Sequence, residues 1–387
     1  RFHEEEKMKK RILSIVLCAA MVMALAAGCG KKEEAKTETT EVKTEQAKSD
    51  DAGTVEENKG TEPYVNTPAK NAEEFAKQIK DSVPEGDYSK LTIGFCGMTL
   101  NNEYHIILAN AVKTACENLG LNVEIQAGAE HASVDEQLTI IENFISQGVN
   151  GIILVPAASQ GLISALQDCK DAGIPVINLD TQLDKTTLST LGEEIPFYGT
   201  DNYVGGQMVG EFFKEMYPDG GKVAILRGVQ GQTNDEDRYK GFLNTAGNID
   251  LVFEQHANWE TDQAYTAIQN CLTSNKDLMA IYCENDLMGI GAYQAIDEAG
   301  LADKVKIFSY DGISEGIQYV IDGNFVSTCA QQPIEMGKLG VINMAKVLMG
   351  EKAETYIDTG CNMVTSDNAK ETMDNVKLYT KAIEASK

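Results

Sequence analysis

Two patterns of hydrophobic positions alternate along this chain. Short runs of β-branched and other apolar residues are bounded by Gly or polar residues, and between them lie stretches of about a dozen residues with apolar positions at helical spacing. The short runs suit strands that are buried on both faces of a parallel sheet, and the longer stretches suit helices. We predict strands at 91–96, 121–125, 151–155, 174–180, 222–226, 251–255, 278–282, 305–310 and 325–330.

Helices are predicted in the intervening stretches, with a short additional helix at 71–83 before the first strand. Strands that alternate with helices of this length form right-handed βαβ units and a parallel sheet. The alternation breaks at 197–201 and then restarts. The sequence therefore predicts an α/β fold of two Rossmann-like, doubly wound parallel-sheet domains. The predicted helices are 104–119, 134–147, 161–172, 202–216, 235–246, 261–273, 286–299 and 333–349, and the tail 367–387 is also predicted to be helical.

Two of the predicted strands lead into an aspartate. Asp180 ends the run Ile-Pro-Val-Ile-Asn-Leu-Asp, and Asp311 follows the run 305–310. Ligands of open α/β sheets bind outside the carboxyl ends of the strands. We therefore expect Asp180 and Asp311 to face one site between the two sheets.

Length and charge narrow the possible partners. A chain of 387 residues is long enough for two domains with separate cores. The formal net charge of -26 argues against nucleic acid or an anionic membrane surface as a partner, because both require clustered Lys and Arg.

The N-terminal region has the pattern of an export signal. After Met8, three basic residues precede an uncharged apolar stretch at 12–27, and the segment 25–29, Leu-Ala-Ala-Gly-Cys, is similar to a bacterial lipobox. We expect a lipoprotein signal peptide at 8–29, a lipid anchor on Cys29 and a disordered tether at 30–70, which is charged and poor in apolar residues. The alternative is an ordinary cleavage site beside an unmodified Cys.

Seven cysteines lie beyond the leader, and they include no C-x-x-C pair. Such spacing indicates buried small apolar residues rather than a disulfide framework. The Cys and His residues also lack metal-ligand spacing, so we expect neither a metal nor a cofactor.

Several short motifs carry a resemblance to a known family. They are Thr92-Ile-Gly-Phe-Cys-Gly-Met-Thr-Leu-Asn-Asn102, Pro175-Val-Ile-Asn-Leu-Asp180, Gly199-Thr-Asp-Asn-Tyr-Val-Gly-Gly206, Glu284-Asn-Asp286 and Ala330-Gln-Gln-Pro333. In this order, the chain from about 91 to 364 resembles the ribose- and galactose-type (type I periplasmic) sugar-binding proteins of ABC transporters. The resemblance implies two lobes joined by three hinge crossovers, with a first lobe of 90–200 plus 332–357 and a second of 201–331 plus 358–387.

The resemblance also implies the ligand-binding residues. Each has a structural alternative: Asn102 is also a good N-cap, Arg238 lies among acidic residues that suit a surface ion pair, and a lone Trp such as Trp259 is usually core. Tyr104 and His105 stand where ribose binders have a pair of Phe, and they are further candidates for the wall of the site. The implied set is Asn102, Asp180, Arg238, Trp259, Asn285, Asp311 and Gln331.

Other positions depart from the ribose and galactose patterns. Met98 stands where ribose binders have Ser, and Thr181 stands where they have Arg. Loss of that Arg removes a cationic fork suited to one sugar configuration, which argues against ribose itself. Asn234 stands where galactose binders use Asp, and the calcium loop of those proteins is absent near 217–220.

These observations predict an extracytoplasmic, lipid-anchored solute receptor of an ABC importer. We expect a monomer that captures a monosaccharide by hinge closure and presents it to a membrane permease. A polyol, inositol, furanone or nucleoside ligand, with or without a chemosensory role, remains an alternative. An enzyme is not favoured, because the sequence has no G-x-G-x-x-G after a first strand and no H-E-x-x-H. A transcription regulator would require a helix-turn-helix where this chain has an export signal.

Overall fold

The computed structural model describes residues 68–385. The predicted signal peptide, Cys29 and nearly all of the predicted tether lie outside these described residues.

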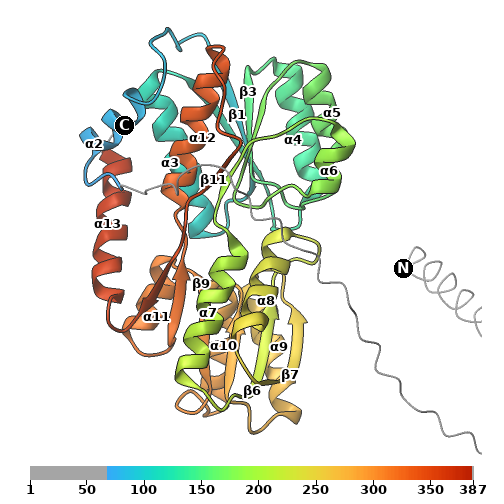
Figure 1. Cartoon of the computed structure of the whole chain (residues 1–387), viewed down its shortest axis with the longest axis vertical. Coiled ribbons are helices and arrows are strands. Elements are labelled where there is room, and N and C mark those ends of the chain that lie inside the picture. Colours follow the sequence, from blue (N-terminus) through green and yellow to red (C-terminus); the bar gives the residue numbers. More distant parts are fainter. Residues whose placement is uncertain (1–67, 386–387) are drawn as a thin grey trace, which may run out of the picture. The chain divides into compact units, whose positions relative to one another are not determined.

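The described chain contains two six-stranded sheets (Figure 1). The first has the order β11-β5-β4-β3-β1-β2, and all of its pairs are parallel. The second has the order β12-β10-β9-β8-β6-β7, and β12 alone runs antiparallel to its neighbour. The strands are β1 (Thr92–Thr99), β2 (Asn122–Gly128), β3 (Gly151–Leu154), β4 (Val176–Leu179), β5 (Phe197–Gly199), β6 (Gly221–Arg227), β7 (Ile249–His256), β8 (Ala280–Cys283), β9 (Lys306–Asp311), β10 (Ser327–Ala330), β11 (Tyr356–Asp358) and β12 (Asn362–Thr365).

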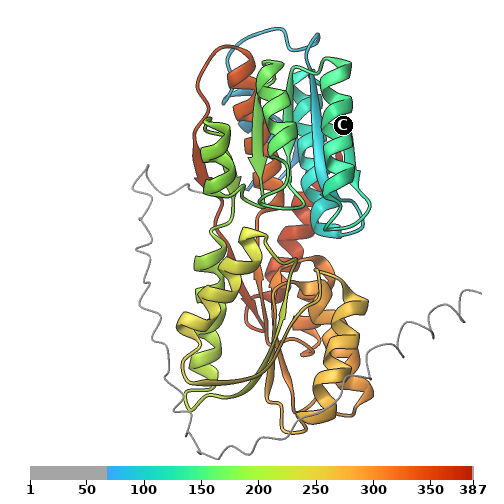
Figure 2. The same ribbon diagram turned by 90° about the vertical axis from the view of Figure 1, so that its right-hand side faces the viewer.

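Helices cover both faces of each sheet, which explains why the inner strands are buried along most of their length (Figures 1 and 2). In the first lobe α3 (Glu103–Leu119) and α12 (Pro333–Leu348) lie on one face, and α4 (Val134–Gln147), α5 (Ile163–Asp171) and α6 (Lys185–Leu191) on the other. In the second lobe α7 (Asn202–Met216) and α8 (Thr233–Thr245) face α9 (Thr261–Ser274), α10 (Asp286–Glu298) and α11 (Ser314–Ile321) across the sheet. This is the predicted fold class.

Sequence-local signals set many of the helix ends. Helix α3 begins after Asn102, whose side chain accepts a hydrogen bond from the backbone N–H of Tyr104, and it ends at Gly120 with φ 73°. Both features satisfy backbone groups that a helix end leaves unpaired. Six of the seven cysteines among the described residues are buried and Cys361 is half-buried, and all seven are free thiols.

The chain crosses between the two lobes three times. It leaves the first sheet after β5, returns to the first lobe after β10, and leaves it again between β11 and β12. These crossings lie toward the same side of both sheets, whereas β2 and β7 form the opposite edges. The predicted strands omitted β5, β11 and β12, and the predicted helices omitted α6 and α11.

The C-terminal helix α13 (Ala369–Ala385) contacts both lobes. Met373 packs in the core of the second lobe next to α11, while Ile383 packs in the core of the first lobe near α3 and α2 (Ala72–Lys80) (Figure 1). The Thr114 hydroxyl also lies 3.4 Å from the Ile383 carbonyl oxygen. The sequence had placed 358–387 with the second lobe, but the last turns of α13 pack on the first.

Candidate functional site

A cavity of about 20 Å³ lies between the lobes at the carboxyl ends of the strands. All nine residues that the sequence singled out line it, together with three others. The first lobe contributes Met98, Asn102, Tyr104, His105, His131 and Asp180, and the second lobe with its crossing segment contributes Asn234, Arg238, Trp259, Asn285, Asp311 and Gln331. The structure therefore brings the whole candidate set to one place.

The two aspartates occupy equivalent positions in the two sheets. Asp180 follows β4 with φ 65°, and Asp311 ends β9 with φ 102°. Left-handed backbone at a non-glycine residue costs about 1–3 kcal/mol and is concentrated at functional sites. Asp180 accepts a hydrogen bond from the Tyr104 hydroxyl at 2.7 Å, which fixes one carboxylate oxygen. Asp311 accepts one from the Gln331 amide at 2.7 Å.

Arg238 is buried at the centre of the site rather than on the surface. It is 3% exposed, and its guanidinium lies over the Tyr310 ring, 3.9 Å from the ring centre. Its Nε donates to the Asn202 side-chain oxygen at 2.8 Å, and its Nη1 lies 3.3 Å from an oxygen of Asp311. The surface ion pair considered from sequence is therefore wrong. These contacts hold the guanidinium as a fixed group of hydrogen-bond donors.

The amide side chains combine structural and site positions. Asn102 and Asn285 both cap helices, accepting from Tyr104 N and Met288 N at 2.9 Å, and both also line the cavity. The N-cap role of Asn102 and its position in the site are thus compatible. The Oε1 of Gln331 is buried and has no hydrogen-bond partner within the described residues, so it is available as an acceptor.

Trp259 forms an aromatic wall of the cavity. Its backbone has φ 66°, and its indole N–H donates to the Gln232 side chain at 2.7 Å. Its ring packs directly on Gly228, where a Cβ atom would lie 1.8 Å from a ring atom. Trp259 belongs to the second-lobe core as well, so the core alternative and the cavity position both hold. Aromatic rings bury apolar area while the indole N–H meets a polar partner.

His131 is the cavity residue that the sequence analysis missed altogether. It lies in the loop between β2 and α4, outside every recognised motif. Its ring centre is 5.6 Å from that of His105. Neither hydrophobic periodicity nor a strand end marks this position, so only the tertiary contact with the other lobe reveals it.

Hydrogen bonds join the lobes directly around the cavity. The Thr233 backbone N–H donates to the Ser159 hydroxyl at 2.8 Å, and the Asn234 amide lies 3.2 Å from the Thr181 hydroxyl. On another side, the Ser314 backbone N–H donates to Glu103 at 2.9 Å. The structure is thus a closed arrangement, in which each lobe satisfies polar groups of the other.

Burial controls the charge states in and beside the site. It raises the pKa of Asp311 to about 6, with Asp180 adding to the rise and Arg238 and Gln331 opposing it. Burial, with the neighbouring His131 and Arg238, lowers the pKa of His105 to about 3, so His105 is neutral at physiological pH. Asp286, which contacts the loop after Asp311, has its pKa raised to about 8 by burial and by the charge of Asp311.

These shifts predict that the ligand-free protein is more stable at mildly acidic pH. Folding raises the pKa of three aspartates above the usual 3.8, to about 6 for Asp311 and for Asp237 on α8, and to about 8 for Asp286. Each contributes stability that is fully present below pH 3.8 and is lost as the pH rises through its pKa in the folded protein. The midpoint of thermal unfolding should therefore rise as the pH falls from about 8.5 to about 5.

The variant Asp286→Asn provides the check on this pH dependence. It keeps the shape of the side chain but removes a carboxyl whose pKa is about 8, so the contribution of this group is lost and the part of the profile above about pH 7 should flatten. A wild-type midpoint that is constant or falls toward pH 5 would contradict the assignment.

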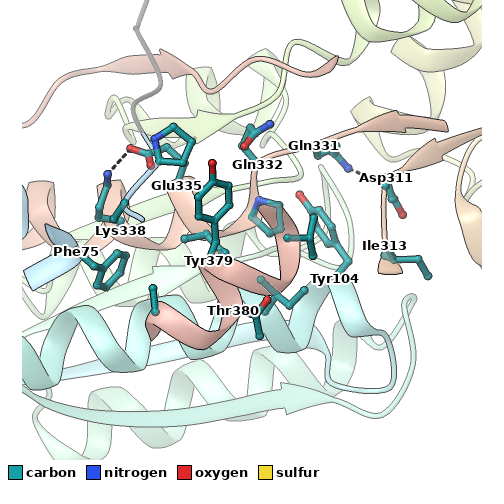
Figure 3. Close-up of a pocket in the computed structure, with 18 residues that line it drawn as sticks. Phe75, Tyr104, Asp311, Ile313, Gln331, Gln332, Glu335, Lys338, Tyr379 and Thr380 are labelled. Atoms are coloured by element: carbon teal, nitrogen blue, oxygen red, sulfur yellow. Dashed lines mark hydrogen bonds and ion pairs between the residues drawn. The ribbon is translucent and has the colours of Figure 1, made fainter. Parts of the chain in front are cut away.

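A second cavity, of about 70 Å³, is lined by the crossing segment 331–335 (Figure 3). It is lined by parts of α2, α3, α12 and α13, and it shares Tyr104, Asp311 and Gln331 with the first cavity. Lys338 and Glu335 form an ion pair at its wall, with Nζ 2.8 Å from Oε1. Lys338 Nζ also donates to Gln78 Oε1 at 2.7 Å, so this cation has two acceptors within the protein.

Two facing α/β lobes, three crossings and a polar cavity between them define a two-lobed receptor for a small polar molecule. The chain belongs to the periplasmic binding protein family, whose domain profile matches residues 93–352.

Similar proteins agree with this assignment. The ribose import binding protein RbsB of Escherichia coli K12 is 29% identical over 291 residues, which cover 75% of this chain and 95% of that protein. The D-allose-binding periplasmic protein of the same organism is 31% identical over 63% of this chain and 80% of its own length. The structure of an ABC transporter periplasmic solute-binding protein from Actinobacillus succinogenes 130z with bound D-allose matches with a TM-score of 0.69 and 32% identity, over 73% of this chain and 100% of that one.

Within residues 68–385, no helix has both the length and the apolar character needed to cross a membrane.

Proposed function

We propose that this protein is the solute-binding component of an ABC importer and that it captures a monosaccharide in the cavity between its lobes. The observation that carries the proposal is the convergence of Asp180, Arg238 and Asp311 with a Trp wall on one interlobe cavity. Carboxylates accept hydrogen bonds from sugar hydroxyls, Arg donates to sugar oxygens, and the Trp face packs against the ring C–H groups.

Capture depends on closure of the lobes. A sugar that bonds to Asp180 on the first lobe and to Arg238 and Asp311 on the second favours the closed arrangement by its differential contacts. The closed form then presents a surface made from both lobes to the permease. Relatives that are named as ribose and fructose import binding proteins and as a D-allose-binding periplasmic protein support a sugar as the captured solute.

The proposal extends to the location of the protein. The leader-like segment 8–29 with Cys29 supports an extracytoplasmic protein that is lipid-anchored to the bacterial cell membrane. The motif is the basis for the anchor, because Cys29 lies outside the described residues.

The ligand itself is inferred to differ from ribose in its hydroxyl configuration. Thr181 stands at the position next to Asp180, and its hydroxyl bonds to Asp180 Oδ2 at 3.3 Å and to Asn234 at 3.2 Å. Thr181 is small and neutral and is hydrogen-bonded within the protein, whereas the ribose binders that the sequence resembles have an Arg at this position. The site therefore suits a sugar whose recognition depends on carboxylates and on the single guanidinium of Arg238.

A thermal-shift screen of the full chain tests the proposal. D-ribose, D-allose, D-fructose, D-fucose and L-arabinose would be compared with inositol, glycerol and nucleosides. A ligand at 100 times its Kd stabilises a protein by about 2.7 kcal/mol, so a true ligand raises the melting midpoint clearly. A shift with a polyol or nucleoside and with none of the sugars would replace the monosaccharide by that class, and no shift at all would contradict the receptor function.

Asp311→Ala should weaken binding of the sugar found in that screen about 30- to 100-fold, because the variant removes an acceptor and leaves Arg238 and Gln331 without their shared partner. Calorimetric titration measures the effect. The control is Asp303→Ala, at an exposed aspartate in the loop before β9, which should bind like the wild type. Equal affinities for the two variants would contradict the site.

A further inference from the structure

His131 makes a direct contact between the two lobes. Its Nδ1 lies 2.9 Å from Oε1 of Glu260, and only 4% of the His131 side chain is exposed. His131 follows β2 in the first lobe, and Glu260 precedes α9, after β7, in the second. Strands β2 and β7 are the edge strands farthest from the three crossings, so this contact joins the lobes on the side away from the hinge.

The contact with Glu260 determines what the other ring nitrogen can do. A carboxylate accepts hydrogen bonds, so in the neutral form of this imidazole the proton lies on Nδ1. Nε2 then carries a lone pair and acts as an acceptor. This Nε2 is buried and has no hydrogen-bond partner among the described residues, and the side chain lines the interlobe cavity.

A buried acceptor without a partner is costly, and native proteins seldom retain one without a reason. The other polar groups around the cavity do not supply the missing donor. Asp180 and Asp311 are acceptors when ionised, and Arg238 donates to Asn202, to the Glu284 carbonyl and to Asp311. The neutral ring of His105 packs at a tilt to His131 rather than bonding to it.

We propose that His131 is a ligand-binding residue of the cleft, whose Nε2 accepts a hydrogen bond from one hydroxyl of the bound sugar while Glu260 of the opposite lobe fixes the ring. This inference rests on the proposed function and deepens it. Ligand hydroxyl, His131 and Glu260 form a chain of hydrogen bonds that ends in the second lobe. Glu260 is a positioning residue, because it sets the tautomer and orientation of His131 without lining the cavity.

The arrangement predicts selectivity as well as affinity. A sugar that lacks the hydroxyl facing Nε2 leaves the acceptor unpaired, and sites of this kind reject such analogues strongly. By contrast, the interlobe bond between Ser159 and Thr233 does not line the cavity. Its loss weakens closure for every ligand alike.

The test combines protein variants with deoxy sugars. The sugar giving the largest shift in the screen above and its set of monodeoxy derivatives would be titrated calorimetrically into the full-length wild type, His131→Ala, Glu260→Ala, Glu260→Gln and Ser159→Ala. We expect His131→Ala to lose about tenfold in affinity for the parent sugar. The derivative that lacks the hydroxyl facing Nε2 should bind the wild type about tenfold more weakly than the parent sugar does. The affinities of His131→Ala for this derivative and for the parent sugar should be almost equal.

The other variants separate positioning from general closure. Glu260→Ala should show part of the affinity loss of His131→Ala for the parent sugar, and its affinity for that one deoxy derivative should be nearly that of the wild type. Glu260→Gln keeps an acceptor for Nδ1, so it should bind all the sugars nearly as the wild type does. Ser159→Ala should weaken all sugars by one common factor. Melting midpoints without sugar show whether each variant is folded, and the 34% exposed side chain of Glu260 makes its replacement the safer of the two.

Two outcomes would overturn the inference while leaving the receptor function intact. In the first, His131→Ala binds every sugar as tightly as the wild type does. In the second, His131→Ala loses affinity for the parent sugar and for all deoxy derivatives by the same factor. A wild type that binds none of the sugars would remove the proposed function and this inference together.

Discussion

Arg238→Ala is expected to abolish sugar binding, with a loss of affinity of about 1,000-fold or more. Truncating one partner of a buried, hydrogen-bonded charge pair in a binding site costs about 2–5 kcal/mol of binding free energy, and each 1.4 kcal/mol is about tenfold in Kd. Arg238 contacts Asp311, Asn202 and the Glu284 carbonyl, so the variant leaves Asp311 buried without a compensating cation. The loss of the guanidinium also removes the donors that face the ligand.

Two variants calibrate this result by calorimetric titration. Arg238→Lys keeps the charge but not the planar fork, so its affinity should fall between those of Arg238→Ala and the wild type. Lys240→Ala removes a cation from the same helix, α8, where its side chain is 60% exposed and pairs with Glu236, and it should leave affinity unchanged. An Arg238→Ala protein that is folded and binds within tenfold of the wild type would show that the guanidinium does not hold the ligand.

Gly206→Ala is expected to destabilise the protein by about 3 kcal/mol, at the upper end of the usual cost of overpacking. Helices α7 and α8 approach each other closely at this residue. A Cβ on Gly206 would lie 2.4 Å from the carbonyl oxygen of Arg238 and 3.0 Å from its Cα. Because these are backbone atoms, the clash is relieved only if one helix shifts. That shift also displaces Arg238, so sugar affinity should fall with stability.

Urea unfolding followed by circular dichroism measures the stability of this variant. The matched control is Val204→Ala, two residues earlier on α7, where the side chain is 44% exposed and the expected change is within about 0.5 kcal/mol. If Gly206→Ala unfolds at the same urea concentration as Val204→Ala, the two helices do not pack as closely as described.

Local pattern and strand ends predicted much of the fold and site. The apolar runs that became β1, β3, β4, β8 and β9 are buried on both faces, so they carry a strong sequence signal. Asp180 and Asp311 were predicted from their positions at strand ends, and the remaining candidates came from the resemblance to sugar-binding proteins. The structure places all of them at the cavity; their contact with a ligand remains a prediction.

The missed features depend on contacts between distant parts of the chain. Strands β5 and β11 have three residues each, and β11 pairs with β5 across more than 150 residues of sequence. Such short segments are too brief to show a period, so pairing alone defines them. The contact between His131 and Glu260 joins residues 129 positions apart. A charged residue before a helix and a histidine in a loop give no local indication that they meet.

Helix α13 limits how the cleft is able to open. Its two ends are embedded in separate hydrophobic cores, and its middle lies beside the crossing segment 331–335. A helix resists stretching, so the distance between its two anchor points stays nearly constant while the lobes rotate. The lobes therefore separate least beside α13 and most at the edges formed by β2 and β7. We therefore expect a solute to reach the cavity, and to leave it, through that far edge.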